Sequence, residues 1–120
     1  MPFKFEKLEI WKLAIDLADG VHNLTRKFPK EEMFSLSSQM KRAADSVSLN
    51  IAEGSTGQSD PEQLRFLGYA QRSGLEVVNC LYLALRRNYI SQQEFNKFYS
   101  ELENLTIKIQ AFKKSFKNIP

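Results

Sequence analysis

The apolar residues in the last quarter of the chain recur at alternating intervals of three and four, and this repeat constrains the fold more than any other feature. It runs without exception through Phe95, Phe98, Leu102, Leu105, Ile109, Phe112 and Phe116. Such a seam puts every apolar side chain on one face of a helix, which neighbouring helices must cover. Ser91 followed by Glu94 forms a capping box that marks the start. We therefore expect a long bundle helix over residues 92–116.

Three further segments have helical apolar spacing, and helix-breaking or capping residues separate them. Pro29 closes the first segment, because the residue before a proline avoids the helical region. Gly54 suits a left-handed position after the second, and Ser59 with Glu62 caps the third. The expected helices cover residues 7–27, 36–53, 60–88 and 92–116.

The connections between these helices are short, and no segment reads as a strand. Short connections place consecutive helices side by side in opposite directions. We therefore expect an all-α fold, an antiparallel up-down-up-down four-helix bundle that forms a single domain over residues 1–120.

The composition favours a globular protein of the reducing interior of a cell. Of the 120 residues, 42% are hydrophobic and 26% are charged, which suits a packed core. The one cysteine, Cys80, has no partner for an internal disulfide. No apolar run approaches the ~18 residues of a membrane span, and the N-terminus does not resemble a signal peptide. We expect a cytoplasmic protein without membrane contact.

The residues that usually carry catalysis or bind metal are scarce. His22 is the single histidine, and neither it nor Cys80 has partners at a familiar metal-ligand spacing. The Gly54–Gly57 segment lacks the Lys-Ser/Thr of a phosphate-binding loop. A lone histidine on a helix is more often a surface residue than a ligand. We expect no enzymatic activity, no cofactor and no metal.

A polar stripe follows the second helix beside its apolar face. Its members step by three, four, four and three residues: Gln39, Arg42, Ser46, Asn50 and Glu53. Ser73 and Glu76 share one side of the third helix. Either the stripe is a solvated face, or it is a partly buried network, with Arg42 paired to Glu53 or Glu76, that fixes helix register or joins subunits. The spacing alone leaves both interpretations open.

The net charge of +3 is unevenly distributed. Residues 1–60 have eight Lys or Arg against nine Asp or Glu, whereas residues 61–120 have nine against five. This bias permits contact with nucleic-acid phosphates, although a plain solvated surface and complementation of helix dipoles are the competing interpretations. The candidate nucleic-acid contacts are Arg65, Arg72, Arg86, Arg87, Lys108, Lys113, Lys114 and Lys117.

Residues 39–54 contain a pattern that resembles a known signature. Gln39-x-x-Arg42-Ala43-x-x-Ser46 and then Asn50-Ile51-Ala52-Glu53-Gly54 are similar to the motif of the four-helix bundle proteins encoded in 23S ribosomal RNA intervening sequences. The Leu8–Lys12 opening, Phe28-Pro29 before Glu32, and Phe66-Leu67 followed by Ala70, Ser73 and Glu76 extend the resemblance over nearly the whole chain. Arg72, where the family usually has glycine, and Gly74, at a more often apolar position, depart from the pattern.

The resemblance implies a left-handed antiparallel bundle that assembles as a homopentameric ring, without enzymatic activity or cofactor. The accessory protein of diversity-generating retroelements is similar in fold, is also pentameric, and binds nucleic acid and a reverse transcriptase through a basic surface. We therefore expect a self-assembling accessory protein that binds RNA or DNA. The alternative is a scaffold whose ring presents a surface to a protein partner.

Overall fold

Four long helices make up the computed structural model of the protein, which describes residues 2–57 and 59–116. Within these residues there is no strand, which confirms the prediction of an all-α antiparallel four-helix bundle. The helices, with two short 3-10 turns, are η1 (Lys4–Lys7), α1 (Glu9–Thr25), η2 (Lys30–Glu32), α2 (Leu36–Gly54), α3 (Asp60–Arg86) and α4 (Gln92–Lys114).

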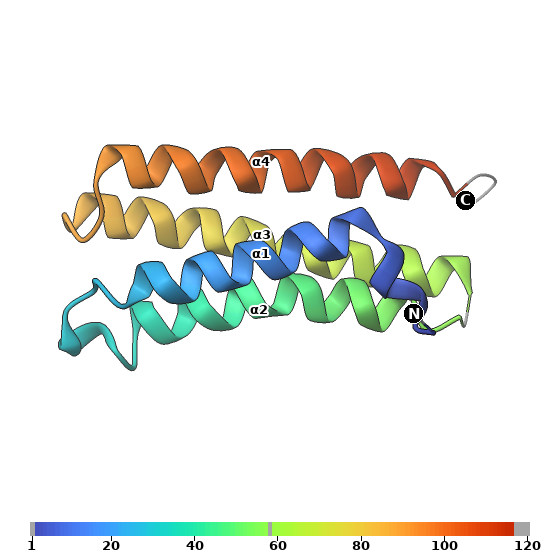
Figure 1. Ribbon diagram of the computed structural model, residues 1–120, viewed down its shortest axis with the longest axis horizontal. Coiled ribbons are helices and arrows are strands. Elements are labelled where there is room, and N and C mark those ends of the chain that lie inside the picture. Colours follow the sequence, from blue (N-terminus) through green and yellow to red (C-terminus); the bar gives the residue numbers. More distant parts are fainter. Residues whose placement is uncertain (1, 58, 117–120) are drawn as a thin grey trace.

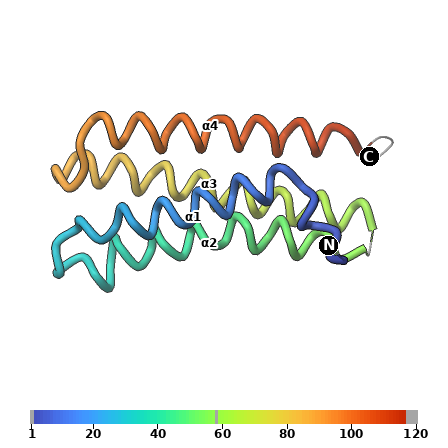
Figure 2. Tube along the Cα trace, in the orientation of Figure 1, coloured from blue at the N-terminus to red at the C-terminus, as the bar shows by residue number. Residues whose placement is uncertain are grey.

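Each helix packs against the two that flank it around the bundle, and chain direction alternates from one helix to the next (Figure 1). The chain passes up and down the bundle in sequence order, so that α1 begins and α4 ends at the same end of the molecule (Figure 2). The most extensive contact is between α2 and α3. The bundle measures 46 × 23 × 23 Å, and α3, with 27 residues, accounts for ~40 Å of its length.

The buried faces of α3 and α4 follow their apolar repeats to different degrees. In α4 the first five members of the seam are buried, whereas Phe112 and Phe116 are half-buried near its end. The apolar spacing expected in α3 runs through Leu64, Leu67, Ala70, Gly74, Val78, Leu81 and Leu85. Val77, Cys80 and Ala84 are buried as well, whereas Leu64, Val78 and Leu85 are only half-buried.

The expected caps form in full on α4 and in part on α3. Ser91 Oγ accepts the Glu94 N–H at 3.1 Å, and the Glu94 carboxylate accepts the Ser91 N–H at 2.8 Å. Ser59 Oγ likewise accepts the Glu62 N–H at 3.3 Å. The second half of that box is missing, because the Glu62 side chain forms an ion pair with Arg65 instead.

Gly54 has a different role from the one its sequence position indicates. The expectation of a left-handed residue after α2 is wrong, because Gly54 is the last residue of the helix and its φ is not positive. A Cβ on Gly54 would lie 2.7 Å from Cβ of Phe66 on α3. Glycine is therefore required here because α3 approaches the end of α2 closely.

The connection from α1 to α2 is fastened by Glu32. The first helix ends at Thr25, earlier than expected, and the chain continues through η2. The Glu32 carboxylate accepts hydrogen bonds from Tyr89 Oη at 2.7 Å, from Ser35 Oγ at 2.7 Å and from Arg87 Nη1 at 3.1 Å. One side chain thus joins the η2 segment to the start of α2 and to the residues that follow α3.

Candidate functional site

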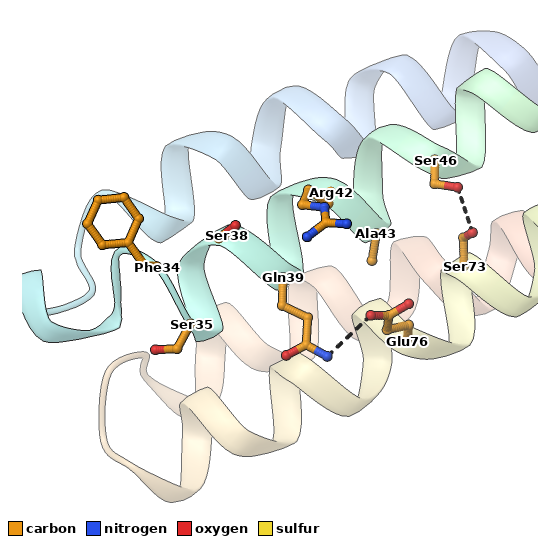
Figure 3. Close-up of a pocket in the computed structure, with 9 residues that line it drawn as sticks. All are labelled: Phe34, Ser35, Ser38, Gln39, Arg42, Ala43, Ser46, Ser73 and Glu76. Carbon is orange, nitrogen blue, oxygen red and sulfur yellow. Dashed lines mark hydrogen bonds between the residues drawn. The ribbon is translucent and has the colours of Figure 1, made fainter.

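An open groove of about 640 Å³ lies between the first half of α2 and the middle of α3 (Figure 3). It contains the greater part of the polar stripe expected from the sequence. Its lining residues are Phe34, Ser35, Ser38, Gln39, Arg42, Ala43, Ser46, Ser73 and Glu76. The two faces of the groove meet through side-chain hydrogen bonds, so its floor is fixed by the pairing of α2 with α3.

Ser46 is the centre of the hydrogen bonding at the inner end of the groove. The Ser73 hydroxyl donates to Ser46 Oγ at 2.9 Å across the two helices, as Figure 3 shows. Asn50 Nδ2 donates to the Ser46 carbonyl at 2.8 Å and to Ser46 Oγ at 2.9 Å. All three side chains are half-buried. This part of the stripe is therefore a helix–helix network within one chain and not a freely solvated face.

The outer members of the stripe are exposed and weakly connected. Gln39 Nε2 donates to Glu76 Oε2 at 3.4 Å, a long bond that contributes little. Arg42 and Glu53 are exposed, and neither forms an ion pair within residues 2–57 and 59–116. The pairing of Arg42 with Glu53 or Glu76 that the spacing suggested is thus not formed within the single chain.

The groove combines features of a surface that recognises another macromolecule. Charges of both signs, from Arg42 and Glu76, line it without an ion pair in the described part of the chain. Phe34 lies at its open end and is 91% exposed, which is unusual for a large aromatic side chain. Sequence reasoning missed Phe34, because it falls between helices and outside every periodic stripe.

Half of the candidate nucleic-acid contacts are already engaged by other side chains. Arg65 pairs with Glu62, Arg87 with Glu32 at 3.1 Å, and Lys108 with Glu9 at 3.2 Å. Lys113 Nζ donates to Gln71 Oε1 at 3.0 Å. The cations of exposed pairs still attract phosphate, but part of their charge is neutralised locally.

The other candidates are spread along the bundle. Arg72, Arg86 and Lys114 are exposed and have no acidic partner among the described residues, and Lys117 lies outside those residues. Arg86 ends α3 and Lys114 ends α4, so the antiparallel packing puts them at opposite ends of the molecule. Arg72 is 14 positions before Arg86, or ~21 Å along α3. A single chain therefore does not gather them into one patch.

The residues with catalytic potential are in unreactive settings. Cys80 is buried in the core, and burial, assisted by the nearby Glu76 charge, raises the pKa of its thiol to about 11. His22 on α1 bonds through Nε2 to Asp45 on α2 at 2.9 Å, which ties the two helices together. Within residues 2–57 and 59–116, no three His, Cys, Asp or Glu side chains cluster closely enough to bind a metal ion.

Comparisons with known proteins give one family and one fold. The family model of the 23S rRNA-intervening sequence protein matches residues 6–111. A crystal structure from Bacteroides thetaiotaomicron VPI-5482, of a protein with unknown function from the S23 ribosomal protein family, superposes with a TM-score of 0.81. It is 21% identical, and the alignment covers 88% of this chain and 98% of that one. No match is found among curated proteins. None of the described helices has the length and apolar character to cross a membrane.

Proposed function

The chain belongs to the 23S rRNA-intervening sequence protein family, and from this premise we propose that it is a non-enzymatic subunit of a homo-oligomer that binds nucleic acid. The α2–α3 groove is the proposed contact between subunits. The cations of α3 and α4 are the proposed contacts to phosphate. The observation that carries the proposal is the groove with its exposed Arg42, which has no ion-pair partner among the described residues and lies within residues 39–54.

The charges along the groove support assembly. Within one chain the groove residues Arg42 and Glu76, and Glu53 further along α2, have no ion-pair partner among the described residues. A neighbouring copy can supply the opposite charges, and it would bury the exposed Phe34 ring at the same time. The pairing of Arg42 with a carboxylate, expected from the sequence, would then form between subunits.

A ring is the arrangement that we propose for this contact. The signature in residues 39–54 resembles that of pentameric bundles, and a head-to-tail contact between unlike surfaces closes into a ring when its rotation allows. A ring also repeats each cation around its circumference. Arg72, Arg86 and Lys114, which are far apart in one chain, would then recur as positive bands able to follow a phosphate backbone.

The nucleic-acid part of the proposal is tested by anisotropy of a labelled RNA hairpin and a labelled DNA duplex, titrated with protein at several salt concentrations. We expect binding at low salt that weakens as salt rises, because bound cations release counterions from the phosphates. Arg72→Ala and Arg86→Ala should each reduce the salt slope by about one. Lys12→Ala, an exposed cation on α1, is the matched control. A folded oligomer that binds neither probe at low salt contradicts the proposal.

A second candidate function is a scaffold for a protein partner, and exposed aromatic residues on α3 and α4 favour it. Tyr82 is 48% exposed and packs edge-on against Phe95 and Tyr99. Leu75, on the same helix as Tyr82, is 70% exposed. Aromatic residues are enriched at protein interfaces. An assembled protein that fails to bind nucleic acid in the titration above would support this function instead.

A further inference from the structure

A second cavity, of about 390 Å³, lies where α1 leads through η2 into α2, far along the chain from the candidate cations of α3 and α4. Its lining contains four basic side chains and no carboxylate. The lining residues are His22, Thr25, Arg26, Phe28, Pro29, Lys30, Met33, Ser37 and Lys41. Three separate elements contribute the cations, so the charge is concentrated by the fold and not by a run in the sequence.

The positive charge of this cavity is not neutralised locally. Arg26 and Lys30 are exposed and Lys41 is half-buried, and none of them has an acidic partner within the part of the chain that the structure describes. His22, which lines the cavity, is hydrogen-bonded through Nε2 to the Asp45 carboxylate at 2.9 Å. Asp45 holds the imidazole in place but does not line the cavity.

The Ser37 hydroxyl is a second feature of the cavity. Ser37, in the first turn of α2, is 7% exposed and lines the cavity, and its side chain makes no hydrogen bond to any described residue. Its oxygen is not among the fully buried, unpartnered polar atoms of the described residues, so we take this hydroxyl to be open to the cavity and free to donate to a bound group. It also lies at the positive end of the α2 dipole, where an anion is stabilised.

We propose that this cavity binds a phosphate monoester through Arg26, Lys41 and the Ser37 hydroxyl. A monoester has close to two negative charges at neutral pH and three strong acceptor oxygens, which match several cations and a free donor. The apolar part of the wall, from Phe28, Pro29 and the 48% exposed Met33, suits the organic group that carries the phosphate. A nucleoside monophosphate fits a cavity of this volume.

The same chemistry has two sources, a free nucleotide and the 5′-phosphorylated end of a nucleic-acid strand. A continuous phosphodiester backbone has one charge per phosphate and passes over a surface, whereas this cavity is concave and suits a terminal group. The inference does not depend on the proposed nucleic-acid surface of α3 and α4, because it uses other residues on other elements.

The test is calorimetric titration of the full chain with adenosine 5′-monophosphate, with adenosine and inorganic phosphate as comparison ligands. We expect the monophosphate to bind, adenosine not to bind, and inorganic phosphate to bind at least about tenfold more weakly, since it lacks contact with the apolar wall. Lys41→Gln and Ser37→Ala should each lower the affinity for the monophosphate about tenfold. Lys12→Gln and Arg86→Gln, which remove cations that do not line the cavity, should leave this affinity unchanged.

Two oligonucleotides that differ only in a 5′-phosphate distinguish a strand end from a free nucleotide as the source of the bound phosphate. Tighter binding of the phosphorylated strand, lost in Lys41→Gln, assigns the cavity to strand ends; equal binding of the two strands assigns it to free nucleotides. The proposal is wrong if the monophosphate fails to bind at about 10 mM, if inorganic phosphate binds equally well, or if both cavity variants bind like the parent protein. Loss of binding only in Arg86→Gln would likewise place the phosphate elsewhere.

Discussion

Ser73 on α3 donates its hydroxyl to Ser46 on α2 at 2.9 Å, while Ser46 also accepts the Asn50 amide at 2.9 Å. The half-buried middle of the signature segment is therefore used to pair two helices of the same chain. Its exposed members Arg42 and Glu53 have no ion pair among the described residues, and we propose that they contact a neighbouring subunit. The spacing of the stripe did not separate its half-buried members from its exposed ones.

The hydrogen bond between the two serines should be measurable in a double-mutant cycle. Ser73→Ala and Ser46→Ala should each lower the free energy of unfolding by about 0.5–1.5 kcal/mol, because each removes the same bond. The double variant should lose less than the sum of the two. Urea unfolding measures all three, with Ser100→Ala, exposed on α4, as the control. Strictly additive losses would mean that the two hydroxyls do not interact.

Gly54 and Gly68 should respond to alanine in opposite ways. Alanine at Gly54 would place its Cβ against the Phe66 Cβ, and we expect a loss of about 1–3 kcal/mol as the two helices move apart. At Gly68, within α3, a Cβ meets nothing within 4 Å, so higher helix propensity should add up to about 1 kcal/mol. Thermal and urea unfolding compare the pair. A neutral Gly54→Ala would contradict the close approach of α2 and α3.

Glu32 should make part of the stability depend on acid pH. The hydrogen bond from Tyr89, followed by that from Ser35, holds the pKa of Glu32 below its usual value in the folded protein. The folded state therefore favours the carboxylate, and this stabilisation is present above the ordinary glutamate pKa and is lost as the pH falls through the lowered one. Glu32→Gln should flatten the dependence of unfolding free energy on pH below about 5.

The control for Glu32 is Glu103→Gln, an exposed carboxylate on α4 without an ion pair among the described residues. It should keep the parent pH profile. Glu94, whose pKa the Lys27 ion pair also lowers, should supply much of the dependence that remains in Glu32→Gln. A Glu32→Gln profile identical to the parent would show that the cluster around this carboxylate does not form in solution.

The helices could be predicted from the sequence because their signals are local. The α4 seam and the Ser91–Glu94 capping box are contained in one segment; the capping box forms and the first five seam residues are buried as expected. The part of α3 that is buried could not be predicted in the same way. Val77, Cys80 and Ala84 are in the core, and spacing within α3 does not reveal which side its largest neighbour, α2, occupies.

The candidate site was predicted in part for the same reason. The periodic polar residues of α2 could be identified, since one helix carries them, but the bond from Ser73 to Ser46 was not predicted, because it depends on how α2 and α3 are paired. Phe34 and the cations of the second cavity were not found. Arg26 directly follows α1, Lys30 begins η2 and Lys41 lies in α2, and only the fold of the connection brings them together.

Arg42→Ala should disrupt assembly while leaving the fold of each chain intact. Arg42 is exposed and without an ion pair among the described residues, so its removal should change the unfolding free energy of the isolated chain by no more than about 0.5 kcal/mol. Sedimentation velocity should show smaller species than the parent at the same concentration. Lys12→Ala makes the same change of charge on α1 and should assemble normally. Equal assembly of both variants would exclude Arg42 from the contact.

The most direct test of the proposed assembly is the light-scattering mass of the purified protein across a range of concentrations. The account predicts a stable species of several times 13.9 kDa, and five times for the ring that the signature segment implies. A protein of 13.9 kDa at every concentration would contradict it, and would leave the exposed charges of the α2–α3 groove as an ordinary solvated surface.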